Sequence, residues 1–267
     1  MSRSCSLPAC TWLSRTQLSR TLIARTLALA ALSIITISCN QTNLTNVRVI
    51  NAISDGPGLD VYLNGSKSFT NMPFLQVEPT PPTYASFYSG QDTFEAFKSG
   101  TTTQPLFGYN GIGNSGQGTG GAIITLNGST EYTVIMDGLY AGPSLVVVPD
   151  NNAVPFENQE EFRVINASPG SPTGGVDVYI VPPNTENLTN YTPQINGLEN
   201  GQGSNYQNLA YLSGGYNVMV TANGSKKALI TELLTPQAQS ITTLVLVDNL
   251  GGLNGMSQTP LILHDLN

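Results

Sequence analysis

The feature that most constrains this chain is a motif written twice. VRVINAISDGPGLDVYLNGS runs from Val47 to Ser66, and FRVINASPGSPTGGVDVYIVPP runs from Phe162 to Pro183. Arg48 in the first copy corresponds to Arg163, 115 residues later. This spacing is the size of an ordinary domain and far exceeds the roughly 20–50 residues of a solenoid repeat. The sequence therefore predicts a duplicated domain.

Further segments recur in the same order in both copies. They are YASFYSGQDTFEAF (84–97) with NLAYLSGGYNVMV (208–220), TEYTVIMDGL (130–139) with SITTLVLVDNL (240–250), and SLVVVPD (144–150) with PLILHD (260–265). Turn formers and prolines interrupt the pattern in PDNNAVPFENQE (149–160), so the boundary is placed there. We expect a signal segment at 1–38, a tether at 39–46, and domains at 47–153 and 154–267.

Within each copy, apolar residues alternate or form short runs separated by Asn-Gly, Ser-Gly and Pro-Gly turns. Val47 and Val49 can face a core while Arg48 faces away, as in a strand. The pattern predicts an all-β fold: two tandem immunoglobulin/transthyretin-like antiparallel β-sandwich domains of about seven strands each, after the signal segment. The Cys–Trp–Cys mark of immunoglobulin domains is absent, since Trp12 is the one tryptophan.

The N-terminal segment is predicted to direct export. Four arginines precede the apolar stretch TLALAALSIITI, which is shorter than the roughly 20 residues of a membrane helix. The following TISC resembles the lipobox of bacterial lipoproteins, which implies that Cys39 is lipidated and becomes the first mature residue. The alternative is an ordinary signal peptide and a secreted protein. By resemblance to enterobacterial lipoproteins, Asn40 after the anchor indicates the outer membrane.

Removal of 1–38 takes away four arginines and both other cysteines, Cys5 and Cys10. The mature chain then holds 6 basic and 17 acidic residues, a formal net charge of −11. Such an acidic surface repels phosphate backbones, so nucleic acid is excluded as a partner. Without a free thiol, thiolate catalysis, disulfides and cysteine-bound zinc are also excluded.

The two copies of the motif resemble the opening of the DUF4397 family, whose members begin with an R-V-x-N-A-S-P-like run ending in V-D-V-Y. LSGGYNVMV (Leu212–Val220) and TLVLVD (Thr243–Asp248) also resemble later strands of that family. The resemblance covers essentially the whole mature chain. It implies tandem DUF4397 β-sandwich modules in an exported bacterial lipoprotein, and it brings no catalytic residues.

Neither a glycine motif nor the histidine of this sequence predicts cofactor binding or catalysis. GIGNSG (Gly111–Gly116) spells the dinucleotide fingerprint, but a loop and a strand follow where that fingerprint needs a helix. His264 is the one histidine of the chain, so a histidine-assisted nucleophile or a histidine-rich metal site is not expected, and His264 is interpreted as a surface residue at a strand end. No cofactor and no enzymatic activity are predicted.

Acidic residues recur at strand starts and ends beside Asn and Gly. They are the candidate calcium ligands Asp60, Asp137, Asp150, Asp177, Asp248 and Asp265. Turn formation is the alternative explanation, since Asp populates turns for conformational reasons. If the first two strands of each copy form a hairpin, the arginines of the motif are expected to pair with carboxylates across it, Arg48 with Asp60 and Arg163 with Asp177.

The remaining candidate is an aromatic surface. Tyrosines with neighbouring Asn and Asp suit stacking on sugars, and the candidates are Tyr62, Tyr88, Tyr179, Tyr191, Tyr206 and Tyr211. The expected function is a non-enzymatic, lipid-anchored cell-envelope protein whose duplicated sandwiches bind or adhere, with a polysaccharide or an envelope or matrix protein as partner. A secreted carbohydrate-active hydrolase and a structural envelope spacer are the alternatives.

Overall fold

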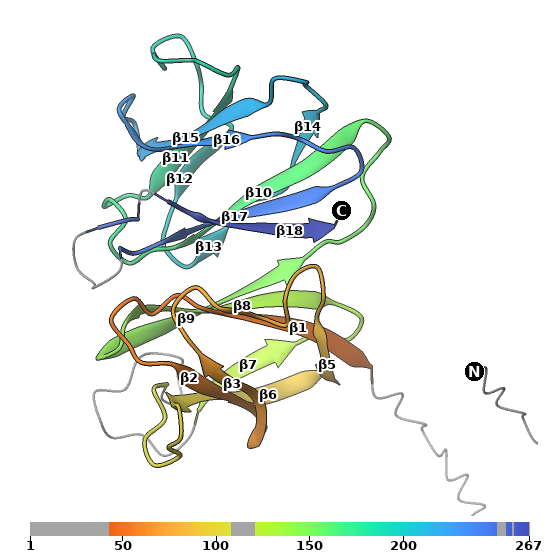
Figure 1. Cartoon of the computed structure of the whole chain (residues 1–267), viewed down its shortest axis with the longest axis vertical. Coiled ribbons are helices and arrows are strands. Elements are labelled where there is room, and N and C mark those ends of the chain that lie inside the picture. The colour runs from red at the N-terminus through yellow and green to blue at the C-terminus, as the bar shows by residue number, and fades with distance from the viewer. Residues whose placement is uncertain (1–42, 108–120, 250–254, 258, 267) are drawn as a thin grey trace, which may run out of the picture. The chain divides into compact units, whose positions relative to one another are not determined.

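The computed structural model describes residues 43–107, 121–249, 255–257 and 259–266, and its regular elements are β-strands (Figure 1). These strands form two similar sandwiches of two sheets each, β1–β9 and then β10–β18. The all-β tandem architecture is confirmed, with more strands per sandwich than the seven expected. No helix among the described residues is long and apolar enough to cross a membrane.

The first sandwich consists of an inner and an outer sheet. In its inner sheet the order is β4 (Val77–Glu78), β1 (Leu44–Asn51), β8 (Glu131–Leu139), β9 (Gly142–Asp150), and β5 (Ala85–Tyr88) also pairs with β1. In its outer sheet the order is β3 (Ser66–Met72), β2 (Leu59–Leu63), β6 (Gly90–Lys98), β7 (Ala122–Leu126).

The second sandwich repeats this arrangement strand for strand. Its inner sheet has the order β13 (Gln202–Gly203), β10 (Gln159–Ala167), β17 (Ile241–Val247), β18 (Leu261–Leu266), and β14 (Gln207–Ala210) also pairs with β10. Its outer sheet has the order β12 (Ile195–Leu198), β11 (Val176–Val181), β15 (Tyr216–Ala222), β16 (Ala228–Leu234).

One strand pair in each sandwich departs from the antiparallel arrangement expected from the sequence. β1 runs parallel to β8, and β10 runs parallel to β17, with Val49 beside Val134 and Val164 beside Leu244. Parallel strands cannot be joined by a tight turn and need a long crossover connection. Here the strands of the outer sheet provide that crossover, so each inner sheet is mixed.

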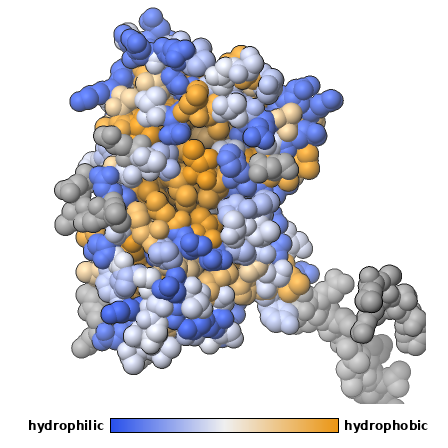
Figure 2. Space-filling model, viewed as in Figure 1, coloured by the Kyte–Doolittle hydropathy of each residue, from blue (hydrophilic) through white to orange (hydrophobic). Residues whose placement is uncertain are grey.

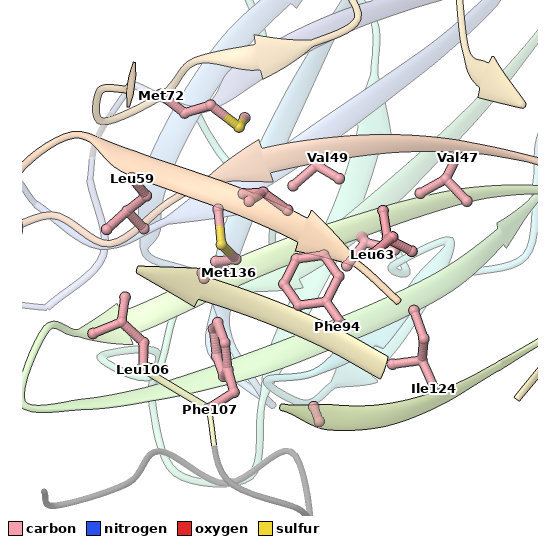
Figure 3. Close-up of a cluster of buried hydrophobic side chains, with 14 of the residues drawn as sticks. Val47, Val49, Leu59, Leu63, Met72, Phe94, Leu106, Phe107, Ile124 and Met136 are labelled. Carbon is pink, nitrogen blue, oxygen red and sulfur yellow. The ribbon is translucent and has the colours of Figure 1, made fainter. Parts of the chain in front are cut away.

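Each sandwich encloses its own apolar core between its two sheets. In the first sandwich Val47 and Val49 of β1 point at Phe94 of β6 and Met136 of β8 (Figure 3). Phe162 and Val164 of β10 take the corresponding positions in the second core. The alternation read from the sequence is thus confirmed for the first strand of each copy.

A third apolar core lies between the two inner sheets. It explains why β1, β8, β10 and β17 are buried on both faces along most of their length. Figure 2 shows apolar side chains gathered across the middle of one face, at the level of β9 and β18 in Figure 1. The buried members of this third core are Ile50, Ala52, Ile135, Val146, Val148, Ile165, Ala167, Val245, Val247 and Leu263.

This shared core packs the two inner sheets against each other. Interfaces between domains are commonly polar enough to permit relative motion, and a large apolar interface removes that freedom. Residues Gln41–Asn267, which hold both sandwiches, accordingly form a single compact unit.

Two arginines are buried at the same interface, and each forms its shortest ion pair with the other sandwich. Arg48 also lies 3.5 Å from Asp150 of its own sandwich. Arg48 of β1 donates through Nη1 to Asp265 Oδ1 of β18 at 2.6 Å. Arg163 of β10 donates through Nη2 to Asp150 Oδ1 of β9. All four side chains are at most 1% exposed. The duplicated motif therefore places reciprocal charges across the interface.

Threonines and tyrosines complete this charge network symmetrically. Thr133 and Thr243 each accept a hydrogen bond from the arginine of their own sandwich and donate to its aspartate, Asp150 and Asp265 respectively. The ring centres of Tyr84 and Tyr206 lie 4.9 and 4.8 Å from the guanidinium carbons of Arg48 and Arg163. Burial alone would lower the pKa of Arg48, but Asp265 and Asp150 raise it above its ordinary value.

The predicted pairs Arg48–Asp60 and Arg163–Asp177 are wrong. They required β1 and β2 to form a hairpin, whereas β1 lies in the inner sheet and β2 in the outer sheet. Arg48 projects from the face of β1 that is turned away from the first core, toward the second sandwich. Asp60 instead accepts a hydrogen bond from Lys67 at 2.7 Å.

The buried ion pairs between the two sandwiches predict a large loss of stability in Arg163→Met. The substitution keeps most of the side-chain volume but leaves Asp150 buried without its closest charged partner. The free energy of unfolding of the full chain, measured by urea titration, should fall by about 3–5 kcal/mol.

Lys67→Met is the matched control, because the Lys67 side chain is 41% exposed in its ion pair with Asp60. Its loss should be limited to about 1 kcal/mol. Equal losses of unfolding free energy in the two variants would contradict a stabilising role for the buried ion pair Arg163–Asp150.

Candidate functional site

The six candidate aspartates form three matched pairs, with one member of each pair in each sandwich. The pairs are Asp60 with Asp177, Asp137 with Asp248, and Asp150 with Asp265. Within the part of the chain that the structure describes, no three His, Cys, Asp or Glu side chains are grouped so that they could hold a metal ion. Calcium binding by these residues stays a prediction, and the structure gives each pair a different set of contacts.

The first pair fastens loops to the outer sheets. Each aspartate accepts two hydrogen bonds from backbone N–H groups at 2.8–3.1 Å, from Asn71 and Gly100 for Asp60 and from Gly197 and Gly224 for Asp177. Burial would raise the pKa of Asp60, but the hydrogen bonds from Lys67 and the backbone outweigh it and hold that pKa well below its ordinary value.

The second pair lies at the ends of the inner sheets. Asp137 of β8 accepts a hydrogen bond from Ser144 of β9, and Asp248, just after β17, accepts one from Ser168 at 2.5 Å. Burial raises the pKa of Asp137 to about 6, and the negative charge of Asp248 adds to the increase. Burial therefore favours the protonated form of the Asp137 carboxyl group.

The candidate tyrosines are spread over the molecule and do not form one platform. Tyr179 is buried in a small cluster with Leu188 and Met219, Tyr206 lies beside Arg163, and Tyr88 is exposed. His264 is exposed near the end of β18, as expected, with Nδ1 3.4 Å from Thr242 Oγ1.

A polar cleft lies in the first sandwich, where β1 and β8 begin and β9 ends. Its volume is about 470 Å³. This polar cleft is lined by Asn46, Ser129, Thr130, Glu131, Asp150, Asn151, Asn152 and Ala153. Amides, hydroxyls and carboxylates thus converge on one hollow, which is the usual character of a site for a polar ligand.

A hydrogen-bond network fixes the walls of the polar cleft. Glu131 accepts from Asn46 Nδ2 at 3.3 Å and also from Asn152 Nδ2. Asn152 Nδ2 also lies 3.1 Å from Tyr84 Oη, and Tyr84 in turn donates to Asp150 Oδ2 at 2.8 Å. The polar cleft therefore rests directly on the buried charge network, which limits its movement.

One buried polar atom of the cleft takes no part in this hydrogen-bond network. Asn152 Oδ1 is buried and has no hydrogen-bond partner among the described residues. A buried polar atom without a partner is destabilising and is usually satisfied by water or a ligand. Burial raises the pKa of Tyr84 far above its ordinary value, so its hydroxyl group keeps its proton and donates it to Asp150 in a hydrogen bond.

The polar cleft distinguishes the two copies. In the inner sheet of the first sandwich, Asn46 of β1 lies beside Glu131 of β8. In the second sandwich Glu161 takes the place of Asn46, and Ile241 takes the place of Glu131. The charge network is shared by both copies, whereas the lining of the polar cleft belongs to the first. Sequence reasoning missed Tyr84 and Asn152, and the replacement of Glu131 by Ile241 between matched segments is the signal that could have found the site.

Three predictions fall outside the described residues. They concern the signal segment 1–38, the lipidated Cys39 and the GIGNSG stretch of the Gly-rich 108–121 segment, of which only residue 121 is described. These stay predictions from the sequence.

The raised pKa of Asp137 predicts a pH-dependent stability. Its folded-state pKa of about 6 exceeds the ordinary value of 3.8, so between these values the folded state binds more protons than the unfolded state. Its contribution to stability is therefore complete below about pH 4 and is lost as the pH rises through about 6. Asp137→Asn should raise the melting temperature at about pH 7.5 and change it little at about pH 4.

Asp60→Asn is the control of opposite sign. The depressed pKa of Asp60 stabilises the fold above the ordinary carboxyl pKa, so this variant should lower the melting temperature at about pH 7.5. A melting temperature for Asp137→Asn below that of the unmodified chain at the same pH would show that burial of the Asp137 charge does not limit stability.

Comparisons with known proteins place the chain in a family. A stretch of residues 45–179 matches the family described as Domain of unknown function (DUF4397). This stretch covers β1–β9 and ends within β11 of the second sandwich. No curated protein sequence matches the chain. Since the matched stretch includes just over half of the 267 residues, the chain belongs to the DUF4397 family.

Proposed function

We propose that this chain is a non-enzymatic, lipid-anchored protein of the bacterial cell envelope, and that its polar cleft binds a polysaccharide. The proposal treats both sandwiches as DUF4397 modules, the second because it repeats the strand order and the R-V-I-N-A motif of the first. The observation that carries the proposal is the polar cleft, which one of two otherwise matching copies has acquired.

The groups in the polar cleft suit a neutral polyhydroxylated ligand. Carboxylate oxygens of Glu131 and amide groups of Asn46 and Asn152 offer both acceptors and donors, as sugar hydroxyls require. The unpartnered Asn152 Oδ1 is an acceptor ready for a hydroxyl. Arg48 and Arg163 lie near the polar cleft through Asp150, but both are buried and already bound to aspartate, so an anionic ligand gains no exposed cation from them.

A hydrolase is less well supported by the same geometry. Glycoside hydrolysis needs two carboxyl groups that are free to act as general acid and as base or nucleophile. The polar cleft has Glu131 and Asp150, but Asp150 accepts hydrogen bonds from Arg163 through Oδ1 and from Thr133 and Tyr84 through Oδ2. Its oxygens are occupied by structural contacts, which favours binding over catalysis.

Binding by the polar cleft predicts a specific pattern of variants. The full chain, in detergent, would be applied to an array of polysaccharides, and the glycan that binds would be titrated against variants. Asn152→Ala and Glu131→Gln should each weaken that binding about tenfold, the effect of losing about 1.4 kcal/mol of interaction.

Glu232→Gln, the same chemical change on β16 of the second sandwich, is the control and should leave the affinity unchanged. Glycan binding that survives both cleft variants would remove the polar cleft from the proposal. If the protein binds none of the polysaccharides on the array, the result would favour a structural component of the envelope.

The anchor has its own test. Cys39→Ser should move the protein from the membrane fraction to the soluble fraction and abolish incorporation of radiolabelled palmitate, because the lipid is attached to that cysteine. Palmitate labelling that persists in Cys39→Ser would place the anchor at another residue.

A further inference from the structure

One end of the double sandwich is where the chain enters from the tether. β1 begins there at Leu44, and the strand registers place Tyr88 opposite Leu44 and Asp150 opposite Glu131, the first residue of β8. The linker 151–158 then joins the end of β9 to the start of β10 at Gln159. We call this region, where β1 and β10 begin and β9 ends, the tether end.

The second sandwich has further loops at the tether end. Ala210 pairs with Gln159, and the backbone N–H of Tyr211 donates to Asn158 at 3.1 Å. The chain then turns into β15, whose first residue, Tyr216, pairs with Leu234. The start of β1, the linker and the turn before β15 are therefore all at the same end.

Most of the exposed large apolar residues of the described chain belong to strands and loops at the tether end. Phe156 is 80% exposed and Tyr88 is 66% exposed, values that are unusual for aromatic side chains. The full set at this end is Leu44, Tyr88, Val154, Phe156, Tyr211, Leu212 and Leu233. Beyond it, Ile123 and Leu229 complete the set of exposed large apolar residues in the described chain.

Gathered apolar residues mark a surface that is covered in the working protein. The spacing of the anchor indicates what covers this one. Leu44 follows Cys39 by five residues, which even a fully extended chain spans in about 18 Å at most. A lipid on Cys39 therefore holds the tether end next to the bilayer, whereas the opposite end carries no such restraint.

We propose that the tether end rests on the lipid bilayer, with Phe156, Val154, Tyr88 and Leu44 entering the interface between headgroups and acyl chains. The inference rests on the proposed lipid anchor. Aromatic and aliphatic side chains of this kind partition into that interface. Because the mature chain has a net charge of −11, the attraction is apolar, and zwitterionic lipid is the suitable surface.

This orientation also places the polar cleft. Its lining includes Ala153, next to Val154, and Asn46, two residues after Leu44. The polar cleft therefore opens at the level of the headgroups. A polysaccharide that reaches it is one that lies along the membrane or is carried on a lipid.

The chain offers a spectroscopic test, because its one tryptophan is Trp12 in the segment that processing removes. Phe156→Trp introduces a single reporter at the tether end. Tyr140→Trp introduces the matched reporter in the β8–β9 turn at the opposite end, where Leu139 pairs with Gly142. Each full-length variant would be produced in a bacterium that processes lipoproteins and reconstituted in phosphatidylcholine vesicles with brominated acyl chains.

The emission of Phe156→Trp should fall roughly twofold relative to vesicles without bromine, since interfacial side chains lie about 5–10 Å inside the headgroup and acyl boundary. The emission of Tyr140→Trp should not change. Tyr88→Trp gives a second reporter at the tether end, should Phe156→Trp fail to fold.

The outcomes separate the orientation from the anchor. Mass spectrometry of the same samples shows whether Cys39 carries a lipid. A lipidated protein whose tether-end reporters are not quenched, or are quenched no more than Tyr140→Trp, overturns the orientation and leaves the anchor standing. A protein without lipid overturns both the anchor and the inference.

Discussion

The exchange of charges between the two sandwiches is the interaction on which the rest of this structure depends. Arg48 reaches Asp265 and Arg163 reaches Asp150, all within an interface from which water is excluded. Buried ions are tolerated only when they are paired and hydrogen-bonded. That requirement fixes how the inner sheets face each other, and the apolar residues on the same faces then close into a third core.

The same network determines where chemistry can occur. Asp150 belongs both to the charge network and to the lining of the polar cleft, and Tyr84 holds it there by a hydrogen bond, so the network supports the cleft from below. Duplication created two equivalent positions, and in the second one Ile241 stands where the first has Glu131. A feature kept in both copies serves the architecture here, and a feature present in one copy is the better candidate for function.

The repeated motif and its alternation were enough to predict two all-β sandwiches and the direction in which Val47, Arg48 and Val49 point. They were not enough to predict the partner of Arg48. Asp265 lies 217 residues away in the other copy, and a motif considered within one copy suggests a local carboxylate such as Asp60. The parallel pairing of β1 with β8 was missed for a related reason, because a strand's direction in a sheet depends on the route of the chain between strands.

The reciprocal arginines have a consequence for how such a protein can change over evolutionary time. Each copy supplies the aspartate that lies closest to the buried arginine of the other copy. Deletion of the second copy, for example, removes Asp265 from Arg48 and Arg163 from Asp150. The duplication is then difficult to reverse, and residues on the two inner sheets must change in step. Positions outside the network, such as those around Glu131, are free to diverge, so the symmetric part of the protein preserves the tandem arrangement while the asymmetric part acquires new binding properties.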